Sequence, residues 1–391
     1  MKLQKEKIII VLTVFIDVLG LGIIIPVLPF YVESFGVSAI TLTLLFSVFS
    51  LFSFVSGPFL GALSDRIGRR PVLIVSILST AIGWFIFASA HAVWVLFLGR
   101  IIDGMAAGNL PIAQSYLVDI ANDDKERTSN LGIIGAVFGT AFIIGPAIGA
   151  ALSSIWHALP FFFVAGLATL NVIGAFFFLP ETHKAMDKEK KMSLNPLRPL
   201  ASAVSDKLLL LRYIAWFFFG ISISGMQSIF ALYLGEIFGF DVVMVGAIYT
   251  AMGLAVFLNQ MVLLRNFWLN YFSESSLEVW MFLSNAIGLL LLMVPSIYFL
   301  IFGIVVHIFS QSLLRVVMTS RAAGIAGHRR RGEVLGIMSS VLSLAMVGGP
   351  LLAGSLFELK PFLPFAACSL ALASGFLIMR RYSAKIAANK G

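Results

Sequence analysis

The sequence predicts an all-α membrane protein with twelve transmembrane helices, arranged as two pseudo-symmetric six-helix bundles. Three observations support this fold class. The chain has 391 residues, of which 59% are apolar and 12% are charged, whereas soluble domains are about 45–50% apolar and about 25% charged. The apolar residues form segments close to the ~20 residues that a helix needs to cross a bilayer. Short motifs of the first half also return in the second half at nearly constant spacing.

The apolar segments define the predicted spans in chain order. The first six are residues 8–31, 40–60, 72–90, 94–118, 130–152 and 160–179. A charged stretch with two prolines follows and is expected to be a cytoplasmic linker. The last six spans are residues 208–235, 242–264, 277–294, 297–320, 333–355 and 362–379. The predicted domains are therefore an N-terminal bundle (1–182), the linker (183–207) and a C-terminal bundle (208–391).

The basic residues predict the orientation of the chain. Most of the 27 Lys and Arg residues lie in the two chain ends, in the linker and in loops on the same side of the predicted spans. Cytoplasmic segments of membrane proteins carry such an excess. We therefore expect a multi-pass protein of a cell membrane, such as a bacterial inner membrane, with both termini in the cytoplasm. The net charge of +8 is then an orientation signal, and no nucleic-acid partner is expected.

An internal repeat relates the two halves. Any single match is weak, but three matches in the same order indicate a duplicated six-helix unit. Repeats of this kind place a substrate path at the interface between the halves. The matching pairs, at offsets of 203 or 204 residues, are 33–36 with 236–239, 131–133 with 335–337, and 145–146 with 349–350.

Residues 61–70 form a basic turn between the second and third predicted spans. They read GALSDRIGRR, which is similar to the signature motif of the major facilitator superfamily. Arg100 and Gly104, in the fourth span, resemble the second motif of that superfamily. The resemblance extends over essentially the whole chain, and it implies the major facilitator fold.

Two spans resemble one branch of that superfamily. The fifth span is similar to the motif that marks drug–proton antiporters, and its small residues also permit close helix packing. The first span, around Asp17, is similar to the tetracycline-efflux-like multidrug transporters. The resemblance implies proton-coupled efflux of small organic molecules by alternating access. The motif residues of the fifth span are Gly135, Gly139, Gly145, Pro146 and Gly149.

The expected partners are a small-molecule substrate, protons and the lipid bilayer. No cofactor or metal site is expected, and the chain is expected to be a monomer. An enzyme is not expected, because no nucleophile–base set, metal-ligand cluster or phosphate-binding loop stands out in the sequence.

The turn after the second span has two readings. A solvated basic loop is one of them. The resemblance implies the other, a charge cluster that acts as a conformational latch and holds the two halves together while the cytoplasmic side is closed. Asp119, at the cytoplasmic end of the fourth span, is the expected partner of Arg69. The latch residues are Gly61, Asp65, Arg66, Gly68, Arg69 and Asp119.

Three ionisable residues within spans are candidates for proton coupling. Ionisable groups at membrane depth are costly and usually functional. Asp17 lies about nine residues into the first span and is followed by two glycines; a carboxyl group in such a place is able to hold a proton at near-neutral pH. Arg100 and Asp103 lie one helical turn apart, and Asp103 is absent from the family pattern. Asp103 is either permanently paired with Arg100 or the titrating group.

Polar residues in other spans are candidates for a substrate cavity. The repeat offset matches Asp103 to His307 in the tenth span, although a lone histidine on an apolar helix is often only a packed side chain. Arg212 and Arg315 are expected to be anchors near the cytoplasmic surface. The candidate cavity residues are Asn109, Gln227, His307 and Gln311.

The chain also departs from the family pattern. Gly83 and Asn285 stand where tetracycline exporters often have aspartate, which argues against tetracycline as substrate. Two alternatives to efflux stay open. One is proton-coupled uptake of a siderophore or metabolite, which fold and motifs do not exclude. The other is a membrane receptor or scaffold that does not transport.

Overall fold

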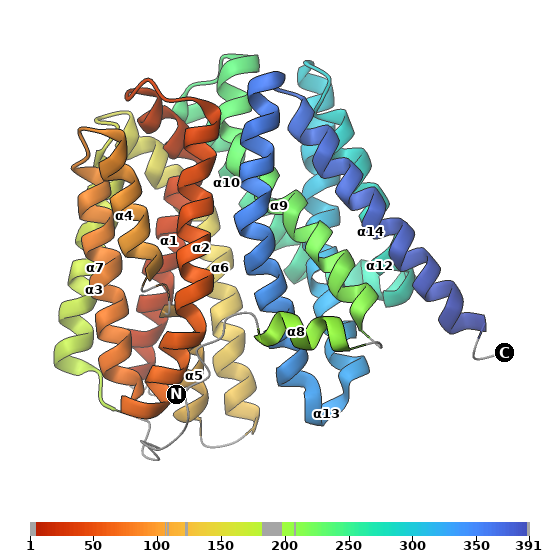
Figure 1. Ribbon diagram of the computed structural model, residues 1–391, viewed down its shortest axis with the longest axis horizontal. Coiled ribbons are helices and arrows are strands. Elements are labelled where there is room, and N and C mark those ends of the chain that lie inside the picture. The colour runs from red at the N-terminus through yellow and green to blue at the C-terminus, as the bar shows by residue number, and fades with distance from the viewer. Residues whose placement is uncertain are drawn as a thin grey trace. The chain divides into compact units, whose positions relative to one another are not determined.

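The computed structural model describes residues 5–105, 107, 109–121, 124–181, 198–206 and 209–388, and these form helices joined by short turns (Figure 1). Most of the predicted linker, 183–207, lies outside the described residues. The chain divides into two compact units. The first contains residues 1–37, 48–196 and 240–250, and the second contains residues 38–47, 197–239 and 251–391.

The first unit holds the helices of the first predicted bundle. The fourth predicted span, 94–118, contains two helices, Val93–Met105 and Asn109–Asp119, and residues 106 and 108 between them lie outside the described residues. The helices are α1 (Lys5–Glu33), α2 (Ala39–Ile67), α3 (Arg69–Ala88), α4 (Val93–Met105), α5 (Asn109–Asp119), α6 (Asp124–Ser153) and α7 (Leu159–Phe178). The first residues of α2, up to position 47, belong to the second unit.

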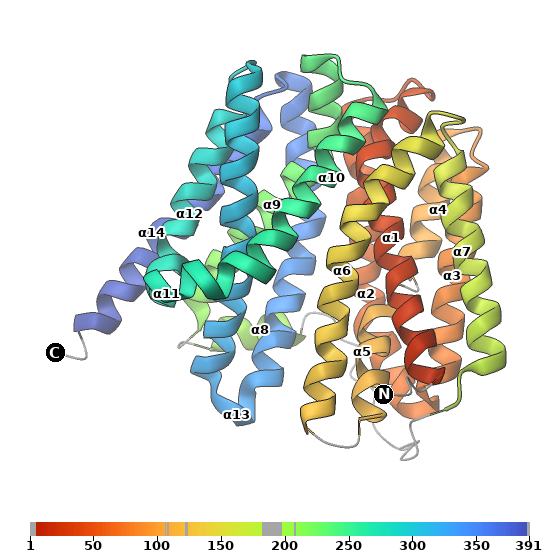
Figure 2. The same ribbon diagram turned by 180° about the vertical axis from the view of Figure 1, so that it is seen from behind.

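The second unit begins with a short helix, α8 (Arg198–Ser205), inside the predicted linker. A ten-residue π-helix, η1, continues α10, and α13 supplies two spans, Ile297–Ala326 and Glu333–Leu359. Figures 1 and 2 show the two arms of α13 turning back on each other. The remaining elements are α9 (Leu210–Phe238), α10 (Val242–Leu258), η1 (Asn259–Trp268), α11 (Leu269–Tyr271), α12 (Glu274–Leu291), α13 (Ile297–Leu359) and α14 (Leu363–Ala388). The part of α10 up to position 250 belongs to the first unit.

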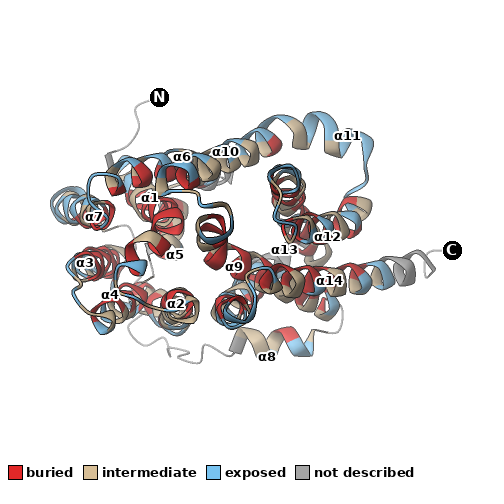
Figure 3. Cartoon of the chain, turned by 90° about the horizontal axis from the view of Figure 1, so that it is seen from above, coloured by how far each residue is buried: buried red, intermediate tan, exposed pale blue. Residues whose placement is uncertain are grey.

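Eleven helical stretches of the described residues are long and apolar enough to cross a bilayer. Each corresponds to one predicted span, with α4 and α5 together forming the stretch Val93–Asp119. The remaining predicted span, 277–294, coincides largely with α12, which carries the polar residues Glu278 and Asn285. Many helices have one buried side and one exposed side (Figure 3). In α7, for example, Phe161 is buried while Phe177 is 70% exposed, as expected for a helix with one face toward lipid.

Tyr31 joins three helices of the first unit. Its hydroxyl donates a hydrogen bond to the carbonyl oxygen of Ala88 at the end of α3 (3.3 Å). Its ring packs against Phe161 of α7, with 4.7 Å between the ring centroids. The hydroxyl of this buried tyrosine is thus hydrogen bonded to the end of a helix, while its ring packs in the core.

Tyr233 makes the same connections in the second unit. Its hydroxyl donates to the carbonyl oxygen of Leu292 (2.5 Å), and its ring lies 4.6 Å from that of Phe365. Leu292 and Phe365 each follow their first-unit counterparts by 204 residues, and Tyr233 follows Tyr31 by 202. The duplication read from the sequence therefore extends to matching side-chain contacts within each unit.

Candidate functional site

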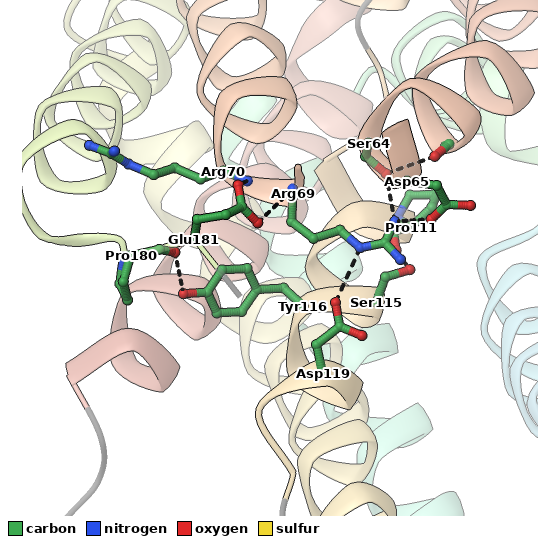
Figure 4. Close-up of polar contacts among 11 residues, drawn as sticks. Ser64, Asp65, Arg69, Arg70, Pro111, Ser115, Tyr116, Asp119, Pro180 and Glu181 are labelled. Carbon is green, nitrogen blue, oxygen red and sulfur yellow. Dashed lines mark hydrogen bonds and ion pairs between the residues drawn. The ribbon is translucent and has the colours of Figure 1, made fainter. Parts of the chain in front are cut away.

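Arg69, the first residue of α3, lies at the centre of a charged cluster (Figure 4). Its guanidinium is 2.6 Å from the carboxylate of Asp65 on α2 and 3.3 Å from that of Asp119 on α5. It also donates to the hydroxyl of Ser64 (2.7 Å). The cluster thus links α2, α3 and α5. One arginine holding two carboxylates is geometrically favourable, because the guanidinium offers several fixed donors.

The turn before α3 depends on Gly68. Its backbone has φ 106°, a conformation that residues with a side chain rarely adopt. The carboxylate of Glu181 accepts hydrogen bonds from the backbone N–H groups of Arg69 (2.9 Å) and Arg70 (3.0 Å). A negative charge there also complements the positive end of the α3 dipole. A Cβ at position 68 would collide with this carboxylate.

Glu181 was not among the residues selected from the sequence. It lies just after α7, beside Pro180, whose carbonyl oxygen accepts a hydrogen bond from Tyr116 (2.8 Å). Two other predicted latch residues are less closely packed. Arg66 is exposed, and no atom lies within 4 Å of where a Cβ of Gly61 would be. The cluster described here lies within the first unit.

Arg100 and Asp103 form a buried ion pair on α4. The guanidinium nitrogen lies 3.2 Å from the carboxylate oxygen, and the two side chains are 4% and 8% exposed. Asp103 also hydrogen bonds with the side chain of Thr80. The guanidinium lies over the rings of Phe49 (4.3 Å) and Trp84 (5.0 Å). Because an unpaired charge at this position would be strongly unfavourable, each member of the pair depends on the other.

Two glycines bring α3 and α4 together beside this pair. A Cβ on Gly83 would lie 2.8 Å from the carbonyl oxygen of Gly99 and 2.9 Å from the Cβ of Asp103. A Cβ on Gly99 would lie 2.7 Å from the carbonyl oxygen of Gly83. Such distances are shorter than van der Waals contact, so only glycine fits at the crossing. Gly83 therefore leaves the space in which Asp103 lies.

The second unit repeats this crossing around His307. A Cβ on Gly288 of α12 would lie 2.8 Å from the backbone nitrogen of His307, and a Cβ on Gly303 would lie 2.9 Å from the carbonyl oxygen of Gly288. His307 is 2% exposed, and its Nδ1 lies 2.7 Å from the side-chain oxygen of Asn285. His307 follows Gly303 by four residues, just as Asp103 follows Gly99. The two ionisable residues thus lie beside similar glycine crossings, each within its own unit, although Asp103 pairs with Arg100 and His307 with Asn285.

A second buried charge cluster was missed by sequence reasoning. Glu278 of α12 is 0% exposed; it accepts hydrogen bonds from Arg212 of α9, one of them at 2.7 Å, and from Arg321 of α13. Arg212 is 1% exposed and lies 5.2 Å from the ring of Tyr382. The predicted anchor role of Arg212 is therefore wrong, because its charge is paired in the interior. An acid within an apolar span was the signal available in the sequence.

The remaining coupling and cavity candidates are distributed over several helices. Asp17 is half-buried on α1, Gln227 is half-buried on α9 and Gln311 is half-buried on α13. The side chain of Asn109 lies outside the described residues. Their roles remain predictions.

The glycine motif of α6 packs partly against α1. A Cβ on Gly145 would lie 3.0 Å from the backbone of Gly22, and a Cβ on Gly149 would lie 3.0 Å from the carbonyl oxygen of Ile23. Gly135, in contrast, has no atom within 4 Å of its Cβ position. Close approach is therefore concentrated in the half of the motif around Gly145 and Gly149.

Comparisons with known proteins agree on one family. The family model described as "Major Facilitator Superfamily" matches residues 10–271. The chain is 26% identical to Quinolone resistance protein NorA of Staphylococcus aureus over 389 residues, which cover 98% of this chain and 99% of the relative. It is 29% identical to Tetracycline resistance protein, class E, of Escherichia coli over 350 residues, which cover 88% of this chain and 86% of the relative.

Solved structures share the fold at low sequence identity. The human organic anion transporter MFSD10 (TETRAN) has a TM-score of 0.72 and 23% identity, and the match covers 96% of this chain and 99% of that one. The nucleoside transporter NupG has a TM-score of 0.77 and 12% identity, and the match covers 97% of this chain and 99% of that one.

Proposed function

Because the chain belongs to the Major Facilitator Superfamily, we propose that it exports small organic molecules across a membrane in exchange for protons. Members of this family are secondary transporters rather than enzymes. The eleven apolar helical stretches of the described residues make this chain a multi-pass membrane protein. Its substrates are small molecules.

The relatives favour export over uptake. Two of them, at 26% and 29% identity, are named for resistance to quinolones and to tetracycline. A membrane transporter that confers resistance to a compound lowers its concentration inside the cell. Efflux is therefore the direction that we assign to this chain.

The buried pair of Arg100 and Asp103 is the observation that carries the coupling mechanism. When Asp103 is ionised, it neutralises Arg100 across 3.2 Å. A proton on the carboxyl group would remove that charge and leave the guanidinium over its two aromatic rings. Proton uptake from the outer side would thus weaken the pair and favour the inward-facing state. Substrate binding from the cytoplasm would then favour proton release. Asp17 is the second candidate acid.

The cluster around Arg69 supports a role in alternating access. It joins α2, α3 and α5 through two carboxylates, and Glu181 fixes the start of α3. We infer that this cluster acts as the conformational latch of the cytoplasmic side. We further propose an inner-membrane location, cytoplasmic termini and a monomeric transporter.

Proteoliposomes with an imposed pH gradient test the coupling. A quinolone should move against the direction of the proton gradient with the wild-type protein, and it should stop doing so when the gradient is collapsed. Asp103→Asn should lose gradient-driven transport, whereas Glu274→Gln, which removes an exposed acid in the first turn of α12, should retain it. Transport that ignores pH, with both Asp17→Asn and Asp103→Asn fully active, would refute proton coupling. Net movement with the proton gradient would instead indicate symport.

A further inference from the structure

Arg315 lies inside a span and has no acidic partner among the described residues. Arg100 pairs with Asp103, and Arg212 and Arg321 share Glu278. Arg315 of α13 forms no ion pair with any part of the chain that the structure describes, and its side chain is exposed.

Arg315 is also deep in its helix. It stands eleven residues before Ala326, where the span Ile297–Ala326 ends, which corresponds to about 16 Å along the helix axis. The other end of the span is about 27 Å away. An arginine facing hydrocarbon at such depth would be costly. Its guanidinium therefore needs water or an anionic partner at that depth.

The helix face that carries Arg315 is polar. His307, Gln311 and Arg315 follow one another at four-residue intervals, which places them along one side of α13. Their exposure increases along the row, from the buried His307 through the half-buried Gln311 to the exposed Arg315.

Most of the exposed apolar side chains near the start of the same span lie on a different face from Arg315. Val305 and Arg315 are ten residues apart, which turns them roughly 80° from each other around the helix. We therefore assign the apolar stripe, and not Arg315, to the side of the helix that faces lipid. The stripe consists of Tyr298, Phe302 and Val305, whereas Ile301, which is also exposed, lies about 40° from Arg315 around the helix.

We propose that Arg315 binds the anionic group of the transported substrate, with Gln311 one turn away as a neutral hydrogen-bonding neighbour. The guanidinium fork matches a carboxylate in two parallel hydrogen bonds, and the substrate then supplies the counter-ion that the described part of the chain lacks. The substrate class is organic carboxylates. This inference rests on the proposed transport function and names the charge of its cargo.

Binding to the purified full-length protein in detergent separates this inference from transport. The probes are nalidixic acid, a quinolone monocarboxylic acid, and its ethyl ester, which differ in the charge of one group. Wild type should bind the acid at least tenfold more tightly than the ester, because hydrogen bonds between charged groups are strong. Arg315→Gln should remove this preference and leave ester binding unchanged. Arg315→Lys should keep part of it, because the charge remains without the fork.

Arg381→Gln is the matched control, since it removes an exposed arginine near the end of α14; it should behave as wild type. The proposal would be overturned if wild type bound the acid and the ester with equal affinity. It would also be overturned if Arg315→Gln lost affinity for both probes by the same factor. A lowered thermal unfolding midpoint of Arg315→Gln would identify a folding defect. In that case the preference of Arg315→Lys for the acid over the ester decides whether the proposal holds. If acid-selective binding is present but a pH gradient drives no transport of the acid, the proposed function fails while the anion site stands.

Discussion

Gly83 of α3 and Asp103 of α4 lie so close that a methyl group at position 83 would be 2.9 Å from the Cβ of Asp103. The absence of a side chain on α3 is thus what lets the acid on α4 reach its buried place next to Arg100. The geometry of the ion pair depends on the crossing of the two helices as much as on the spacing of its own residues.

Gly83→Ala should therefore destabilise the protein and impair transport together. The added methyl group would also lie 2.8 Å from the carbonyl oxygen of Gly99, so the helices must separate, at a cost of about 1–3 kcal/mol. Thermal unfolding in detergent measures the loss. Gly174→Ala on α7 is the control, because no atom lies within 4 Å of that Cβ position. Equal stability of the two variants would contradict the tight crossing.

Asp103→Asn should lower the stability of the protein more than the removal of a charge from an exposed position does. The reason is that Arg100 would stay buried without the counter-charge of Asp103. Breaking a buried pair from one side costs about 3–5 kcal/mol in typical proteins. The double variant Arg100→Met/Asp103→Leu should recover much of the unfolding temperature, since it removes both charges, yet it should not recover pH-driven transport. If the double variant transports normally, the pair is only structural.

Much of the fold was predictable because local spacing determines it. Apolar segments and repeat offsets predicted the order of the helices and the match of Asp103 with His307, each of which lies beside a glycine crossing. Arg100 and Asp103 are three residues apart on one helix, so their contact also follows from helix geometry.

Contacts between distant helices were not predictable in the same way. Glu278 lies 66 residues from Arg212 and 43 from Arg321, and only the packing of α9, α12 and α13 brings them together. The π-helix η1 carried no sequence signal that we used. Within it, Asn259 is buried, donates to Ser312 (2.7 Å) and accepts from Trp268 (2.9 Å), contacts that depend on the widened helical register.

Glu278→Gln should destabilise the protein more than Arg212→Met. The first change leaves two arginines facing each other, whereas the second leaves Glu278 still paired with Arg321. Unfolding temperatures of the two variants in the same detergent give the order directly. Glu274→Gln, on the exposed first turn of α12, should shift the temperature little, because surface charges contribute about 0–1 kcal/mol. A smaller loss for Glu278→Gln than for Arg212→Met would show that the carboxylate is not the centre of the cluster.

Gly68 and Glu181 should show a non-additive effect in a double-mutant cycle. Glu181→Ala removes the carboxylate that accepts from two backbone N–H groups of α3, a loss comparable to that of a helix cap, about 1 kcal/mol. Gly68→Ala costs more, because it combines an unfavourable φ of 106° with a collision against the same carboxylate.

The double variant Gly68→Ala/Glu181→Ala relieves the collision but keeps the backbone strain, so its loss of stability should be smaller than the sum of the two single losses. Gly57→Ala on α2, where no atom lies within 4 Å of the Cβ position, provides the baseline for a helical glycine. Strict additivity would mean that Glu181 does not occupy the space beside Gly68 in the protein in detergent. The latch would then have to be built on Arg69, Asp65 and Asp119 alone.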